Sequence, residues 1–213
     1  MKFLMIYQKT KRMKKLIIIG LLTFGSLSCS SAQDINLPSP NRTGGKPLMD
    51  ALNERQSNRE FSDKELSMQT LSDLLWAAWG FNREDKRTAP SSADRQELDL
   101  YVALNTGIYF YDAKNQKLIM KTPGNHQVKT GTQAFVGNSP LNIIFVANLD
   151  KASSRDAALI DCGFISQNIY LFCASEGLNT VVRGLFDRNE LHKLLGLSEN
   201  QEALLTQSVG YKQ

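Results

Sequence analysis

Histidine and cysteine are both scarce in this sequence of 213 residues, which contains two histidines and three cysteines. No cysteine spacing suggests a zinc site. A Ser–His–Asp or Cys–His arrangement would need one of the two histidines. His126 lies in a polar stretch, where a lone histidine is more often exposed than catalytic, and His192 lies in a helix expected at the surface. The scarcity argues against zinc chemistry and against a nucleophile–base pair.

Disulfide bonds are also not expected. Outside the N-terminal segment the cysteines are Cys162 and Cys173, eleven positions apart on one expected helix. This spacing separates them by about 16 Å along the helix axis, whereas a disulfide requires Cα atoms within about 7 Å. We expect both to be buried thiols that pack as small apolar residues.

A surplus of basic charge is absent from most of the chain. Residues 1–32 contain six of the 25 Lys and Arg residues and no Asp or Glu. Removing these six leaves 19 basic against 21 acidic side chains, a net charge of −2. The rest of the chain therefore offers no electrostatic case for nucleic-acid binding.

The apolar run at residues 16–24 is too short for a permanent membrane span. Basic residues precede this run and small residues follow it. This order is typical of a secretory signal peptide, which we place at residues 1–32 with cleavage before Gln33. The product would be exported to the periplasm or cell envelope. The alternative is that Cys29 becomes the lipidated first residue of a lipoprotein, which would give the protein a lipid anchor.

The rest of the chain divides into an arm and a domain. Residues 33–46 are rich in Pro, Ser, Asn and Gly. They are expected to form an extended N-terminal arm that stays loose or lies on a partner subunit. Residues 47–213 are enough for one domain with a real core.

Hydrophobic periodicity and capping residues predict both helices and strands in this domain. Helices are expected at residues 47–55, 67–79, 156–176 and 187–195, and strands at 98–104, 107–111, 117–120, 141–147, 178–182 and 204–209. The second helix places Trp76 and Trp79 in the core or in a subunit contact. The helix at 156–176 is apolar nearly all round, so we expect it to be buried on every side. Polar residues interrupt it and argue against a membrane span.

Residues 55–59, with the sequence Arg-Gln-Ser-Asn-Arg, place two guanidinium groups and a hydroxyl just after the first helix. Guanidinium forks fit phosphate oxygens, and a hydroxyl with free backbone N–H groups at a helix end can complete such a site. A solvated charged turn is the alternative. Residues 88–96 form a second run of small and hydrogen-bonding side chains, which either is an ordinary loop or lines a polar heterocycle.

Taken together, four parts of the chain resemble the flavin-dependent nitroreductase family. They are residues 55–61, residues 89–96, residues 161–168 with 174–178, and residues 182–184 with 209–211. No single motif is specific, but their order and spacing are, and the similarity covers residues 47–212. The hairpin around residues 107–111 favours the subgroup of peptide-azoline and oxime-type dehydrogenases.

The resemblance implies an α+β fold with a mostly antiparallel sheet flanked by helices. It also implies an FMN cofactor and a homodimer with flavin at the interface. Arg55, Gln56, Ser57 and Arg59 form the motif that would hold the FMN phosphate and ribityl chain, and Lys212 sits near the family's usual terminal basic contact to the phosphate.

The resemblance places further residues around the flavin ring. Asp94 stands where the family often has Asn; a carboxylate can accept from the flavin N3–H but cannot donate. Gln96 would contact the ring or ribityl edge. Arg183 and Gly184 would present backbone N–H groups near flavin N5 and O4.

The chemistry implied is that of the flavin, so we expect no catalytic side chain and no metal. The protein would transfer hydride or electrons via flavin N5 to or from a small organic substrate. NAD(P)H is one donor; because an exported enzyme leaves the compartment where NAD(P)H is made, another redox protein is the alternative. Two other functions remain open: a non-catalytic flavin-binding or electron-carrier protein of the cell envelope, and an exported interaction domain without cofactor.

Overall fold

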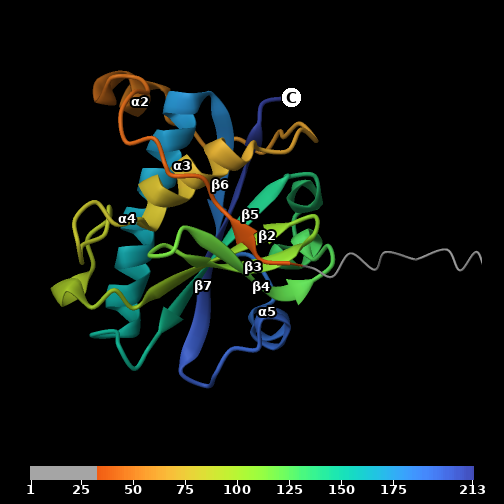
Figure 1. Ribbon diagram of the computed structural model, residues 1–213. Coiled ribbons are helices and arrows are strands. Elements are labelled where there is room, and N and C mark those ends of the chain that lie inside the picture. Colours follow the sequence, from red (N-terminus) through yellow and green to blue (C-terminus); the bar gives the residue numbers. More distant parts are fainter. Residues whose placement is uncertain (1–32) are drawn as a thin grey trace, which may run out of the picture. The chain divides into compact units, whose positions relative to one another are not determined.

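A seven-stranded antiparallel sheet forms the centre of the protein in the computed structural model, which describes residues 33–213 (Figure 1). The strands are β1 (Ile35–Asn36), β2 (Leu98–Leu104), β3 (Gly107–Asp112), β4 (Lys117–Pro123), β5 (Leu141–Asn148), β6 (Leu178–Arg183) and β7 (Gln201–Tyr211). Their order is β1-β4-β3-β2-β5-β7-β6, and neighbours run antiparallel. The expected α+β class is confirmed. The predicted signal peptide lies outside the described residues.

Helices cover both faces of this sheet. They are α2 (Leu48–Glu54), α3 (Met68–Trp79), α4 (Arg155–Glu176) and α5 (Arg188–Leu195), with short 3-10 helices at Ser92–Asp94, Gln127–Thr130 and Ala134–Gly137. Alternate residues of a strand point to opposite faces. Ile143 and Phe145 of β5 therefore join the core under α3 and α4, whereas Ile144 and Val146 join a smaller core with α5.

The helix ends follow the capping residues that the sequence predicts. Ser67 Oγ accepts from the N–H of Thr70 at 3.0 Å, and Asp187 Oδ1 accepts from the N–H of Glu190 at 3.0 Å. Gly177 ends α4 with a φ of 71°, a left-handed conformation that strains other residues. The chain reverses there, and β6 runs back in contact with α4.

Several side chains expected in the interior are found there. Trp79 is buried and donates its Nε1–H to the carbonyl of Leu98 at 2.8 Å. Cys162 and Cys173 are free and buried, and burial raises the pKa of both thiols. They are therefore inert packing residues, as the spacing predicted.

The prediction that α4 is buried on every side is wrong for the single chain. Ile165 and Ile169 are fully buried, but Ile160 is 60% exposed and Phe164 is 43% exposed. By length and apolarity alone α4 could cross a membrane, yet its inner face packs in the same core as the sheet. Its outer face exposes large apolar side chains to solvent. These side chains are the reason why the sequence pattern predicted burial on every side.

The N-terminal arm lies on its own chain and is not loose. Ile35 and Asn36 pair with β4, at the edge of the sheet. The Ser72 hydroxyl donates to the carbonyl of Pro38 at 2.5 Å, which fixes the arm to α3. The Arg42 guanidinium lies 5.5 Å from the ring centroid of Trp76. A partner subunit is thus not needed to order the arm.

Candidate functional site

The loop at residues 55–61 is fixed along β6, the last strand of the sheet. The N–H of Asn58 donates to the carbonyl of Thr180 at 3.0 Å. The side-chain amide of Asn179 donates to the carbonyl of Glu60 at 2.6 Å. An edge strand has backbone groups without a neighbouring strand, and here the loop supplies a partner for one of them, the Thr180 carbonyl. The motif selected from the sequence is therefore anchored to β6 at two points.

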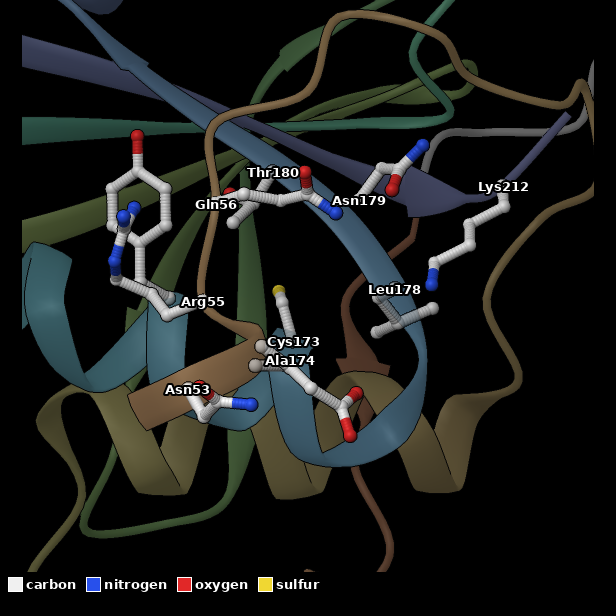
Figure 2. Close-up of a pocket in the computed structure, with 11 residues that line it drawn as sticks. Asn53, Arg55, Gln56, Cys173, Ala174, Leu178, Asn179, Thr180 and Lys212 are labelled. Carbon is white, nitrogen blue, oxygen red and sulfur yellow. The ribbon is translucent and has the colours of Figure 1, made fainter. Parts of the chain in front are cut away.

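A cavity of about 260 Å³ opens beside this loop, between the end of α2, the last turns of α4 and strand β6 (Figure 2). Its polar lining includes Arg55, Gln56, Tyr170, Asn179, Thr180 and Lys212. Figure 2 shows Arg55 and Lys212 on opposite sides of the cavity, one from the loop and one from just beyond β7. The structure thus brings two neighbouring predicted site residues, Arg55 and Gln56, together with a third, Lys212, that is far from them in sequence.

Positive charge dominates this cavity. Arg55 and Lys212 are its basic side chains, and Glu54 is its one carboxylate. Glu54 is already paired, because its Oε2 lies 2.5 Å from the Nζ of Lys46. The arrangement suits a phosphate group, which guanidinium and ammonium donors bind through charge-assisted hydrogen bonds.

Tyr170 joins two members of the loop and was not selected from the sequence. Its ring lies under the Arg55 guanidinium, with Cζ 5.4 Å from the ring centroid. Its hydroxyl lies 2.7 Å from Ser57 Oγ. A tyrosine within an apolar helix indicates core packing, so the sequence carried no signal for this role.

Arg59 does not line the same cavity. It borders a neighbouring hollow of about 730 Å³, together with Phe61, Gln127 and Pro140. Residues 55 and 56 of the loop therefore line the first cavity, and residues 59, 60 and 61 of the same loop line the second. The prediction that Arg55 and Arg59 hold one ligand requires a molecule that extends from one recess to the other.

The Arg183 side chain points into the protein. It is 5% exposed; its Nη2 donates to Asn142 Oδ1 at 3.1 Å, and its Cζ lies 5.6 Å from the Phe135 ring centroid. Its Nε and Nη1 have no partner among residues 33–213, and burial lowers its pKa to about 10. The predicted contact uses backbone N–H groups of Arg183 and Gly184, which this side-chain position leaves untouched.

Asp94 and Gln96 lie in a different part of the molecule. Asp94 pairs with Lys86, which holds the pKa of that carboxyl below its usual range. Gln96 Oε1 accepts from Arg87 Nε at 3.0 Å. The N–H of Ser92 donates to Asp161 Oδ2 at 2.7 Å, near the start of α4.

The length of α4 gives the distance between the segment that holds Asp94 and the cavity. Asp161 and Cys173, which lines the cavity, are twelve positions apart on this helix, or about 18 Å. One chain therefore does not bring Asp94 and Gln96 to Arg55.

The segment with Asp94 also contains unusual backbone. Ala93, Asp94 and Gln96 have φ values of 51°, 54° and 49°, in the left-handed region. Each such residue costs about 1 kcal/mol or more when it is not glycine. Strain of this kind gathers at functional sites, where surrounding structure enforces it. This observation favours a binding role for the segment over an ordinary loop.

Comparisons with known proteins show the family to which the chain belongs. Residues 52–211 match the sequence model of the Nitroreductase family. A protein of Methanocaldococcus jannaschii whose name assigns it to the nitroreductases is 30% identical over 182 residues, 78% of this chain and 91% of that protein. A crystal structure from Ralstonia eutropha, also assigned to the nitroreductases by name, is 39% identical with a TM-score of 0.80 and covers 86% of this chain and 91% of its own.

A more distant solved structure shares the fold alone. It is named an FMN-dependent nitroreductase, from Clostridium difficile, and is 19% identical with a TM-score of 0.56. The alignment covers 77% of this chain and 87% of that one.

Proposed function

Because the chain belongs to the nitroreductase family, we propose that it is an FMN-dependent oxidoreductase that acts on a small organic substrate. The observation that carries this proposal is the cationic cavity that holds Arg55 and Lys212 beside the loop anchored to β6. Bound FMN would supply hydride or electron transfer at its N5. The residues of the chain would bind and orient it.

The residues present fit a flavin phosphate. Arg55 and Lys212 offer charged donors, and Ser57 offers a hydroxyl on the same loop. The carboxylate nearby, Glu54, is neutralised by Lys46, so it does not repel an anion. The neighbouring recess at Arg59 is large enough to accept a further part of an extended ligand. Backbone N–H groups at Arg183 and Gly184 remain our proposed contacts to the flavin ring.

We further propose that two copies pack through α4 and α2 as a homodimer. Six apolar side chains on these helices are exposed in the single chain: Leu48, Met49, Leu52, Leu159, Ile160 and Phe164. Exposed apolar surface of this kind marks an interaction site. The exposed apolar side chains of α4 lie in its first half, which also contacts the segment that holds Asp94, whereas those of α2 lie on the helix that ends at the cavity.

A two-fold axis across α4 would complete the site. In such an isologous interface the start of one α4 lies beside the end of the other. Asp94 of the partner subunit and Gln96 of the partner subunit would then approach the Arg55 cavity. This geometry explains why a single chain keeps two predicted halves of one site apart.

The finer assignments are also proposals. The peptide-azoline or oxime-type subgroup rests on the hairpin formed by β3 and β4. Export to the cell envelope rests on the predicted signal peptide. NAD(P)H is the proposed electron donor, with another redox protein as the alternative for an exported enzyme.

Titration of the purified chain, residues 33–213, with FMN tests the proposal. We expect a yellow complex, and Arg55→Ala is expected to weaken FMN binding by about 10- to 150-fold, the loss of one charge-assisted hydrogen-bonding group. The matched control is Arg188→Ala, an exposed arginine on α5 that lies outside both the cavity and the Asp94 segment, and this variant should bind FMN like the wild type.

Two outcomes would contradict this. A chain that stays colourless with added FMN would favour an interaction domain without cofactor. An Arg55→Ala variant with unchanged affinity for FMN would indicate that the loop is a solvated charged turn and not a phosphate site. If FMN binds but no donor, whether NADH, NADPH or an azoline peptide, is oxidised at steady state, the protein is better described as a flavin-binding or electron-carrier protein.

A further inference from the structure

We propose that Tyr170 is a positioning residue of the phosphate site. Its hydroxyl turns the Ser57 proton toward the ligand, and its ring holds the Arg55 guanidinium in place. This inference rests on the proposed function of the cavity and assigns the role to a residue that carries no family motif. Its consequence is that Tyr170 sets the preference of the site for a flavin that carries a phosphate.

Tyr170 lies where α4, β6 and the loop meet. It is 7% exposed and lines the cavity, whereas Ser57 is exposed on the loop. Its hydroxyl oxygen accepts from the N–H of Val182 at 3.1 Å and lies 2.7 Å from Ser57 Oγ. The Arg55 Cζ lies 5.4 Å from its ring centroid. One buried side chain therefore contacts two elements of the proposed clamp.

The direction of the hydroxyl bond follows from what each group can do. A backbone N–H only donates, so the Tyr170 oxygen acts as acceptor toward Val182. Its own proton then has one acceptor among residues 33–213, the Ser57 oxygen. In the reverse direction the phenol proton of Tyr170, a residue only 7% exposed, would have no acceptor among residues 33–213, whereas solvent can accept the proton of the exposed serine.

The Ser57 hydroxyl lies beside Tyr170 but is not itself part of the cavity lining, and its proton is thereby left free to donate to a ligand that extends from the cavity over the loop. Its oxygen accepts from Tyr170, so its proton is the group left to face outward. A phosphate oxygen only accepts, so this orientation matches it and leaves no proton misplaced. The Val182, Tyr170 and Ser57 groups form a chain in which each bond polarises the next.

Arg55 is oriented by the same residue in a different way. Among residues 33–213 its guanidinium has no carboxylate partner and no hydrogen-bond partner. Stacking over an aromatic ring uses the face of the guanidinium and leaves its N–H edges free. The ring thus limits the motion of Arg55 while its donors stay available to an anion.

The test compares FMN with riboflavin, which has the same ring and ribityl chain but lacks the phosphate. Tyr170→Phe keeps the ring and removes the hydroxyl. We expect its Kd for FMN to rise about 5- to 10-fold, the size of one indirect hydrogen-bond loss, and its Kd for riboflavin to stay within about twofold. Tyr101→Phe, at a tyrosine that is also 7% exposed but lies on β2, is the matched control and should change neither.

A double-mutant cycle checks that Tyr170 acts through Ser57. Ser57→Ala, at an exposed position, and the double variant Ser57→Ala with Tyr170→Phe should bind FMN equally, because the second change removes nothing further. Additive losses would overturn the inference, as would an equal loss of FMN and riboflavin affinity in Tyr170→Phe. If the wild type binds FMN and Tyr170→Phe binds it equally well, the role of Tyr170 is contradicted but the proposed function is not. If the wild type binds neither flavin, both the proposed function and the role of Tyr170 are contradicted.

Discussion

Glu97 and Asp161 are buried carboxyl groups beneath the segment that holds Asp94. Glu97 is 2% exposed, and neither of its oxygens has a donor among residues 33–213. Burial, together with the neighbouring Asp161, raises the pKa of Glu97 to about 6. The other charged group near it is Arg95, which favours the ionised form but does not offset burial. A proton on one carboxyl lets it donate to the other.

This pair predicts a pH dependence with a definite sign. The folded protein keeps the Glu97 proton at a pH where the unfolded chain, with the ordinary glutamate pKa of 4.5, has released it. Stability from this group is therefore greatest below pH 4.5 and falls as pH rises through 6. We expect the free energy of unfolding to fall by on the order of 1–2 kcal/mol between pH 5 and 7.5.

Urea unfolding at these two pH values checks the prediction. Glu97→Gln carries no titrating group at this position, so its stability should change less across the same range. Glu84→Gln, at an exposed glutamate, should behave like the wild type. Equal pH dependence of the free energy of unfolding in the wild type and Glu97→Gln would show that the Glu97 carboxyl is not its cause.

Single residues differ in how far the sequence reveals them. Ser67, Asp187 and Gly177 were predicted, because capping is a local property of the chain. Arg55 and Lys212 could be grouped only by resemblance, since their approach depends on how α2 and β7 end beside each other. Tyr170 could not be found at all, because its role depends on which side chains reach it from other elements.

At the scale of elements, the loop at residues 55–61 depends on its anchor to β6. The Asn179 amide, at 2.6 Å from the Glu60 carbonyl, is a buried contact between them. Asn179→Ala is expected to lower the free energy of unfolding by about 1 kcal/mol. It should also make the loop cleavable by trypsin after Arg55 and Arg59, because trypsin requires a mobile backbone.

Limited proteolysis with mass analysis of the fragments measures this. Asn200→Ala removes a side-chain amide that donates to Asp150 Oδ2 at 2.8 Å on the surface, so it is the matched control. It should leave the loop as resistant as in the wild type. Equal resistance in Asn179→Ala would show that the backbone bond of Asn58 is a sufficient anchor.

Strands with an apolar sequence pattern were easier to predict than strands, or strand ends, that depend on hydrogen bonds to a neighbouring strand. β2 was predicted with its observed bounds, because Leu98–Leu104 is apolar and β-prone. β7 extends over Gln201–Tyr211, beyond the predicted residues 204–209, because its polar ends are held by neighbouring strands. β1 was not predicted, since two residues carry no period and become a strand only by pairing with β4.

At the scale of the whole molecule, the proposed homodimer can be broken at one position. Phe164 is 43% exposed on the outer face of α4. In Phe164→Glu a charge would be buried in the interface, and the cost of desolvating it would favour separate chains. We expect a monomer at micromolar concentration that also loses FMN, because each site would need residues of both chains.

Sedimentation velocity of the wild type and the variant tests this. Met68→Glu is the matched control, since Met68 is also 43% exposed but lies at the start of α3. It should remain a dimer with bound flavin. A wild-type monomer that retains FMN at micromolar concentration would contradict the proposal.

The fold could be predicted from the sequence, whereas the positions of the site residues relative to one another could not. Periodicity and the family resemblance gave the α+β architecture, because both depend on patterns within the chain. The separation of Asp94 from Arg55 depends on the length and direction of α4, and no local pattern reports it. The outer face of α4 shows the same limit: apolar residues on all sides predicted burial, but Ile160 and Phe164 are exposed in the single chain.

The loop along β6 has a further consequence for the behaviour of the protein in solution. The sheet ends at β1, which has two residues, and at β6, which has six. An uncovered strand is a template to which a strand of another molecule can add, and repeated addition builds cross-β fibrils. The loop that carries Arg55 covers part of the β6 edge in the native chain, because its Asn58 N–H donates to the Thr180 carbonyl. A protein whose loop detaches would therefore lose its ligand site and gain a route to aggregation in the same event.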